Sequence, residues 1–167
     1  NTFNTYWNAP NGGTSTSAKY RDPSAWYHVV LQANTSTLKL YVNGAQQTSR
    51  SISGDGQINN GNAEHAIGRY SGAGSTFNGY MSEIVFIDGT ALAPTSFGES
   101  DSISGIWKPI DVSDLTFGQN GFYLEFKQSG TSQNSSGLGA DTSGNDNHFA
   151  VNNLTALDQS TDTCTNN

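Results

Sequence analysis

Short apolar runs and alternating apolar and polar positions, separated by polar turns, follow one another along much of the chain. The run Trp26–Leu31 is rich in aromatic and β-branched residues, and Leu38–Val42 alternates between apolar and polar positions. The polar residues Asn34–Thr37 lie between them, so we expect a hairpin. Asn43-Gly44 is a strong turn signal and predicts a second hairpin that continues into Gln46–Ile52.

The strongest strand prediction in the chain is the run Phe77–Ile87, which Asp88-Gly89 ends. Gly121–Phe126 predicts another clear strand. We expect the large side chains of Trp26 and Phe77 to fill the core between two sheets. Weaker signals predict short strands at Ile58, Ala66–Tyr70 and Phe149–Val151. The stretch Ala91–Phe97 predicts a short helical turn around Pro94.

These elements indicate an all-β fold, because no stretch shows a helical period and turn signals recur every 8–12 residues or so. The expected architecture is an antiparallel β-sandwich. We expect the sandwich segment over residues 1–99 and a connector over 100–120, in which Trp107 anchors against the body. Residues 121–151 would add strands that complete the sandwich or open a next domain, and 152–167 would form a polar tail.

Four pieces of sequence, in this order, resemble the laminin-G-like, concanavalin-A-like jelly roll: Trp26–Val30, Leu40–Gly44, Ile67–Arg69 and Phe77–Ile84. The resemblance covers roughly residues 20–99 and implies a jelly-roll β-sandwich. In that family several strands precede the position of Trp26, whereas 25 residues precede it in this sequence. We therefore expect a sandwich that is incomplete at its N-terminus, or a fragment of a longer polypeptide.

A narrower resemblance is to laminin-G-like segments of marine bacteriophage structural proteins. It is carried by four stretches: Tyr20–Trp26, Ile87–Leu92, Ser96–Glu99 and Gly105–Pro109. This resemblance implies a component of a virion surface or of a tail fibre.

The charge balance argues against nucleic acids and membranes as partners. Fourteen acidic and seven basic residues give a net charge of −7, and Lys and Arg form no cluster that could contact phosphates. No apolar run approaches the length of a membrane span. Charged residues make up 13% and aromatic residues 11% of the chain, which favours a folded protein with long polar loops over a disordered one.

The acidic residues do not form a glycosidase pattern, since such enzymes need two carboxylates at a defined separation. The four glutamates are widely scattered, at Glu64, Glu83, Glu99 and Glu125, and no predicted strand presents two acids at alternating positions. No Gly-x-Ser-x-Gly motif is present. We expect no enzyme and assign no catalytic residue.

One acidic cluster has oxygen ligands of the kind that Ca²⁺ prefers: Asp141, Ser143, Asn145 and Asp146. It lies in a stretch, Asp141–His148, that resembles an element of many laminin-G-like domains. The EF-hand pattern is excluded because Asp146 and Asn152 replace its sixth-position Gly and twelfth-position Glu. Two interpretations remain: a Ca²⁺ site of another kind, or a turn whose side chains bond their own backbone. We expect no other cofactor.

Loops rich in Asn, Tyr, Ser and Gly have the composition of adaptable binding surfaces. Five residues are candidates for glycan binding: Tyr6, Trp7, Asn62, Tyr70 and Asn78. The alternatives are that these loops are simply polar and rich in turns, or that the aromatic residues contact other subunits.

The function we expect is that of a non-catalytic virion structural or surface protein, a tail-fibre or capsid decoration component that contacts a host surface glycan. Its other partners would be virion proteins or copies of itself, and it would lie on the virion surface or be extracellular. The alternatives are a secreted carbohydrate-binding module or adhesin of a cell and, with less support, a polysaccharide depolymerase.

Overall fold

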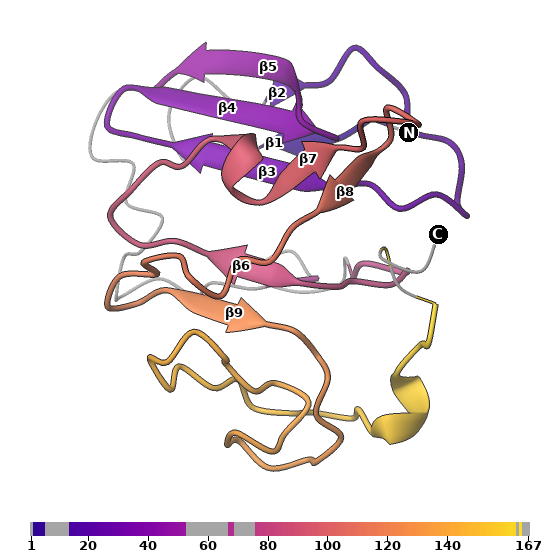
Figure 1. The fold of residues 1–167 in the computed structure, drawn as a ribbon, viewed down its shortest axis with the longest axis vertical. Helices are drawn as coiled ribbons and strands as arrows, with labels where there is room; N and C mark the ends of the chain where they lie inside the picture. The colour runs from indigo at the N-terminus through magenta and orange to yellow at the C-terminus, as the bar shows by residue number, and fades with distance from the viewer. Residues whose placement is uncertain (1, 6–13, 53–66, 69–75, 163, 165–167) are drawn as a thin grey trace. The chain divides into compact units, whose positions relative to one another are not determined.

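The computed structural model describes residues 2–5, 14–52, 67–68, 76–162 and 164 (Figure 1). The strands are β1 (Asn4–Thr5), β2 (Thr14–Ser15), β3 (Val29–Ala33), β4 (Thr37–Val42), β5 (Ala45–Ser51), β6 (Ile84–Phe86), β7 (Gly98–Ser100), β8 (Trp107–Pro109) and β9 (Phe122–Leu124). Two short 3-10 helices, η1 (Pro94–Ser96) and η2 (Ala156–Asp158), complete the elements. Strand pairs are antiparallel and the described residues contain no α-helix, which confirms the predicted fold class.

The three-stranded sheet β3-β4-β5 is the most regular part of the fold. Strand β4 alternates strictly, and its inward residues Leu38, Leu40 and Val42 are 2%, 3% and 3% exposed. Because successive side chains of a strand point to opposite faces, this pattern alone sets which face of the sheet is buried. The two predicted hairpins are confirmed.

The turn between β4 and β5 consists of Asn43 and Gly44, whose φ angles of 48° and 75° lie in the left-handed region. Asparagine and glycine tolerate this region better than other residues do. The Asn43 side chain also accepts a hydrogen bond of 2.9 Å from the backbone N–H of His28, and its own N–H donates to His28 O at 2.8 Å. One asparagine therefore forms the turn and extends the pairing of β4 with the start of β3.

Trp107 lies in a slot that depends on two glycines. A Cβ added at Gly44 would overlap the six-membered ring of the indole, and one added at Gly98 would overlap its Nε1 edge. The ring of His28 lies 5.8 Å away, centroid to centroid. The expectation that Trp107 anchors its segment is confirmed.

The chain around Trp107 is more regular than predicted. Strand β8 lies within the expected connector over residues 100–120 and pairs with β7, so that Ser100 lies opposite Trp107. The sequence signal was weak because each strand has three residues and β7 (Gly-Glu-Ser) has no apolar side chain. The short helical turn predicted around Pro94 is confirmed as η1.

The long strand predicted over Phe77–Ile87 is reduced to β6, Ile84–Phe86. Glu83 adopts a positive φ of 53°, which breaks the extended conformation immediately before β6. The prediction that Phe77 fills the core is wrong, because its side chain is 55% exposed. Trp26 is only half-buried.

Strand β9 pairs with β6 and is enclosed on both of its faces: Tyr123 is 8% and Leu124 3% exposed. Phe86 and Phe122 are cross-strand partners whose rings stack at 5.5 Å. The strand predicted at Phe149–Val151 is wrong. Phe149 instead packs its ring edge-on against Phe122 at 4.9 Å, and its backbone N–H donates to Gly139 O at 2.8 Å.

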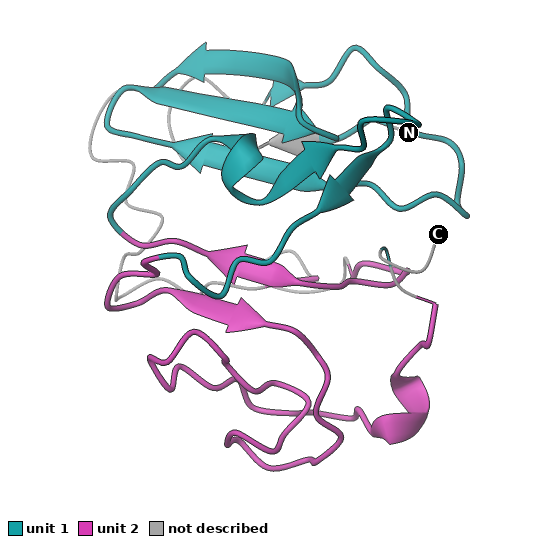
Figure 2. Cartoon of the chain, viewed as in Figure 1, with its two compact units in different colours: residues 1–56, 89–115, 164–167 teal, residues 57–88, 116–163 magenta. Residues whose placement is uncertain are grey.

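The chain divides into two compact units, each built from separate stretches of sequence (Figure 2). Unit 1 comprises residues 1–56, 89–115 and 164–167, and unit 2 comprises 57–88 and 116–163. The domain boundaries predicted above stay a prediction. The strands predicted at Ile58 and Ala66–Tyr70 fall wholly or mostly outside the described residues, and Ile67-Gly68 forms no strand. None of the helices in the described part of the chain is long and apolar enough to cross a bilayer.

We predict that Trp107→Ala lowers the free energy of unfolding by about 2–3 kcal/mol, because it empties a slot that the neighbouring backbone cannot close. Urea denaturation measures this change. Ile103→Ala is the control: this side chain is 96% exposed, so we expect its effect to stay within about 0.5 kcal/mol. Equal effects of the two substitutions would show that Trp107 is not an anchor.

Candidate functional site

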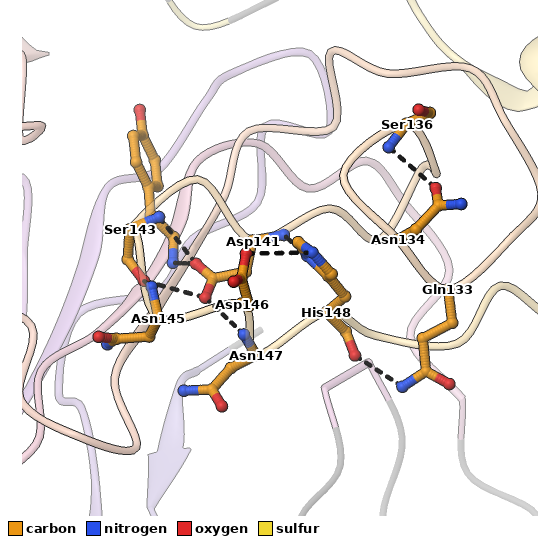
Figure 3. A network of polar contacts seen from close by, with 10 residues as sticks. Gln133, Asn134, Ser136, Asp141, Ser143, Asn145, Asp146, Asn147 and His148 are labelled. Carbon is orange, nitrogen blue, oxygen red and sulfur yellow. Dashed lines mark hydrogen bonds and ion pairs between the residues drawn. The ribbon is translucent and has the colours of Figure 1, made fainter.

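The predicted acidic cluster is organised around the carboxylate of Asp141, a residue that is 5% exposed (Figure 3). Its Oδ1 accepts hydrogen bonds from the backbone N–H groups of Tyr123 at 2.8 Å and Ser143 at 2.9 Å. Its Oδ2 accepts from the Ser143 hydroxyl and from the backbone N–H of Asn147, both at 2.9 Å. Four donors thus surround one buried carboxylate, which is the condition for burying such a charge.

Two opposing effects act on the pKa of Asp141. Burial raises the pKa, whereas the hydrogen bonds from Tyr123, Ser143 and Asn147 lower it, and the pKa ends below its usual value. The pKa is lowered overall because the hydrogen bonds together stabilise the ionised carboxylate by more than burial destabilises it. Asp141 is therefore ionised at neutral pH.

His148 closes the loop that Asp141 opens. Its Nδ1 accepts a hydrogen bond of 3.0 Å from the backbone N–H of Asp141, so the ring proton of the neutral imidazole resides on Nε2. Nε2 faces the Asp146 carboxylate at 3.5 Å. The backbone carbonyl of His148 accepts from the side chain of Gln133 at 2.8 Å, which connects the loop to the preceding turn (Figure 3).

Two asparagines of the same loop hold the turn that precedes β9. Asn145 Nδ2 donates to Gly118 O and Gly121 O, at 2.6 and 3.0 Å. Asn147 Nδ2 donates to Gln119 O and Gly121 O, at 3.2 and 2.9 Å. These hydrogen bonds tie the loop to the turn before β9, so the loop stabilises the approach to the strand.

This geometry bears on the four predicted calcium ligands. Asp141 and Ser143 are brought together but bond to each other, Asn145 uses its amide on carbonyl groups, and the Asp146 side chain is 87% exposed. In the described ranges no group of three or more His, Cys, Asp or Glu residues could hold a metal ion. The contacts match a turn that bonds its own backbone; the calcium site stays a prediction, which titration of the thermal midpoint with Ca²⁺ tests.

Of the five candidate glycan residues, Tyr6, Trp7, Asn62 and Tyr70 lie outside the described residues. Asn78 is described and exposed, between two exposed aromatic side chains: Phe77 at 55% and Tyr80 at 70%. The apolar side chains of Ile67 and Met81 are also exposed, at 42% and 38%. We call the residues Ile67, Phe77, Asn78, Tyr80 and Met81 the aromatic segment.

Local contacts hold the aromatic segment in place. The backbone N–H of Phe77 donates to Gly68 O at 2.6 Å, and Met81 Cε would contact a Cβ at Gly68 at 3.4 Å. The ring of Phe77 lies over Gly79, where an added Cβ would come within 2.8 Å of it. These contacts hold the backbone at Phe77 beside Gly68.

Sequence reasoning missed Phe77 and Tyr80 as surface residues because they fell within the longest apolar run. The signal that would have revealed them is Asn78-Gly79, a turn dipeptide in the middle of a predicted strand. A turn at that point removes the two aromatic residues from the strand and so from the core.

A pair of acids was also missed. Glu99 on β7 and Asp101 directly after it stand two residues apart, and Lys108 on β8 lies 3.4 Å from the first and 3.5 Å from the second. Asp101 lies beyond the end of β7 at Ser100, so the prediction that no strand presents two acids at alternating positions holds for the described strands. The pairing was hidden because this region was expected to be a connector.

The environment of this pair opposes acid–base catalysis. Hydrogen bonds from the backbone N–H groups of Ser104 and Ile103 lower the pKa of Asp101 to about 2, and the hydroxyl of Ser104 and the charge of Lys108 act in the same direction. A glycosidase general acid needs a raised pKa to be protonated at neutral pH. Glu125 is paired with Lys127. Glu64 lies outside the described residues.

Comparison with known proteins places the chain in a family. Residues 1–95 match the laminin G family model described as the concanavalin A-like lectin/glucanases superfamily, and this match spans more than half of the chain. The chain belongs to this family, whose fold is a β-sandwich jelly roll, and the predicted sandwich is confirmed. Searches of curated proteins and of solved structures each found no match to the chain.

We predict that Asp141→Asn lowers the free energy of unfolding by about 2–3 kcal/mol at neutral pH, because an amide cannot accept from four donors and places its own NH₂ among them. Asp146→Asn, on an exposed side chain, is the matched control, with an expected effect within about 0.5 kcal/mol.

The pH dependence provides a second readout. Since the folded-state pKa of Asp141 is lowered, its contribution is present above the unfolded-state pKa of about 3.9 and is lost as the pH falls through the folded-state value. The stability difference between wild type and Asp141→Asn should therefore narrow below about pH 4. A difference that is constant with pH would contradict the role of the ionised carboxylate.

Proposed function

We propose that the chain is a non-catalytic carbohydrate-binding β-sandwich that contacts glycans through the aromatic segment. The observation that carries this proposal is the shared exposure of Phe77, Asn78 and Tyr80 next to a backbone hydrogen bond from Phe77 to Gly68. Membership of a superfamily that contains lectins supports it.

The chemistry of these side chains suits a sugar. An aromatic ring offers an apolar face on which the C–H groups of a pyranose can pack, while a tyrosine hydroxyl and an asparagine amide supply donors and acceptors for its hydroxyl groups. Tyrosine and asparagine are favoured in adaptable binding surfaces for the same reasons. A net charge of −7 disfavours polyanionic glycans, so we propose a neutral one.

The non-catalytic part of the proposal rests on what surrounds the described carboxylates. Asp141 is occupied by four donors, and Glu99 and Asp101 share one lysine. Neither arrangement provides one protonated and one ionised carboxyl group facing an open space, which hydrolysis of a glycosidic bond requires.

We further propose that the protein is a structural component of a virion surface, a tail fibre or a capsid decoration, where glycan contact serves attachment to a host. The resemblance of several stretches to bacteriophage structural proteins supports this placement. Its partners would then be other virion proteins or copies of itself. A secreted carbohydrate-binding module or adhesin of a cell is the alternative that shares the same site.

We predict that Tyr80→Ala weakens binding to a glycan-array hit about five- to tenfold, which corresponds to about 1–1.4 kcal/mol for one aromatic contact. Titration calorimetry with that glycan measures the change. Leu157→Ala removes an apolar side chain that is 95% exposed on η2 and serves as the control, with unchanged affinity expected. If both variants bind as tightly as wild type, the aromatic segment is not the glycan site.

Two further measurements separate the alternatives. We expect incubation with host polysaccharide to release no new reducing ends; their release would replace the binding proposal with a depolymerase. Antibody labelling of intact particles in electron microscopy should place the chain on virions. Labelling of the host cell surface alone would support the adhesin.

A further inference from the structure

We infer that Asn78 is a site of spontaneous covalent modification, at which the side-chain amide cyclises onto the next backbone nitrogen and converts to aspartate and isoaspartate. The inference concerns the chemistry of the residue and stands whether or not the aromatic segment binds a glycan. The fold holds three Asn-Gly pairs in different ways, and Asn78 is the least restrained of them.

The sequence contains five Asn-Gly pairs, and glycine favours cyclisation because it has no side chain to hinder the approach of its nitrogen. Three of them are described, beginning at Asn43, Asn78 and Asn120; the other two, at Asn11 and Asn60, lie outside the described residues. The reaction needs a side-chain carbonyl carbon that can rotate toward the following backbone nitrogen and a nitrogen that is free to lose its proton. The fold decides which pairs meet these requirements.

Asn43 and Asn120 are restrained. The Asn43 side chain accepts from His28 N at 2.9 Å within a tight left-handed turn. The Asn120 amide donates to Asp88 Oδ2 at 2.8 Å, and the attacking nitrogen of its neighbour, Gly121, donates to Gly118 O at 3.3 Å. Each restraint must break before cyclisation, and a hydrogen bond of this kind contributes about 1 kcal/mol or more.

Asn78 lacks these restraints. Its side chain is exposed and forms no hydrogen bond with the described residues, and the backbone nitrogen of Gly79 makes none with them either. The segment belongs to no strand, so the backbone is not held by a ladder at this point. The ring of Phe77 occupies the place of a Cβ at Gly79, and Asn78 itself is exposed.

The reaction balances without any partner other than water. The Gly79 nitrogen loses its proton and bonds to Cγ of Asn78, while the bond from Cγ to the side-chain nitrogen breaks and that nitrogen leaves as ammonia with the proton. Water then opens the five-membered imide at either carbonyl, which yields aspartate or isoaspartate. The product places a negative charge between Phe77 and Tyr80.

The test is ageing of the full-length folded protein in mildly alkaline buffer, followed by digestion and mass spectrometry of each Asn-Gly peptide. Cleavage after Glu83 separates Asn78 from Asn120. We expect Asn78 to convert at least about tenfold faster than Asn43 or Asn120, since 1.4 kcal/mol of lost restraint corresponds to a factor of ten. Comparable or slower conversion at Asn78 would overturn the inference.

Two controls show that the fold sets this order. In denaturant the three rates should converge, because all restraints are then lost. Gly79→Ala should slow conversion at Asn78 alone: Gly79 does not have a positive φ, so alanine fits its backbone, and only the ring of Phe77 has to move. If Gly79→Ala leaves the rate at Asn78 unchanged, the proposed cyclisation is wrong. The measured quantity is mass, so failure of this test is distinct from failure to bind glycans.

Discussion

The burial of a single carboxylate, that of Asp141, is the constraint on which the loop after β9 in unit 2 depends. An ionised group can be placed away from water only where donors replace its hydration. These donors come from β9, through Tyr123, and from the loop that follows Asp141 itself. The backbone at Asp141 and Thr142 also continues the pairing of β9 on the side away from β6. The charge and the strand edge therefore specify one loop conformation together.

Side-chain oxygens that accept backbone N–H groups recur through the protein and account for its polar composition. Only 34% of the residues are hydrophobic, so apolar burial alone has little material from which to specify the long connections. The short side chains of Asp and Asn instead fix turns by accepting, on Oδ1, backbone N–H groups two or three residues ahead. Four examples in separate loops are Asp22, Asn34, Asp101 and Asn134. Polar side chains that suggest ligand sites in the sequence thus largely accept hydrogen bonds from the protein's own backbone.

How far the sequence predicted the structure depended on how much of the signal was local. The hairpins around Asn34–Thr37 and Asn43-Gly44 were predictable because alternation and turn chemistry act within a few residues. Strands β7 and β8 were missed because each has three residues and β7 has no apolar side chain, while Gly44, which leaves room for Trp107, lies far from it in sequence. Phe77 was misplaced because hydrophobicity outweighed the turn signal beside it. At the candidate site, Asp141 and Ser143 were found by residue type, but the role of Asp141 as an acceptor depends in part on Tyr123 of β9, which no local pattern reveals.

The two compact units are assembled from alternating stretches, and the chain passes from one to the other four times, after residues 56, 88, 115 and 163. Neither unit is a continuous segment, so no single cut releases one of them intact. Each must also gather strands that are separated by whole stretches of the other, such as β6 and β9. The entropy cost of closing such long loops comes before the stabilising contacts between the strands can form. This order of events is characteristic of slow-folding β proteins. During synthesis from the N-terminus, neither unit is therefore completed early. Unit 2 gains β9 only after most of unit 1 has been synthesised.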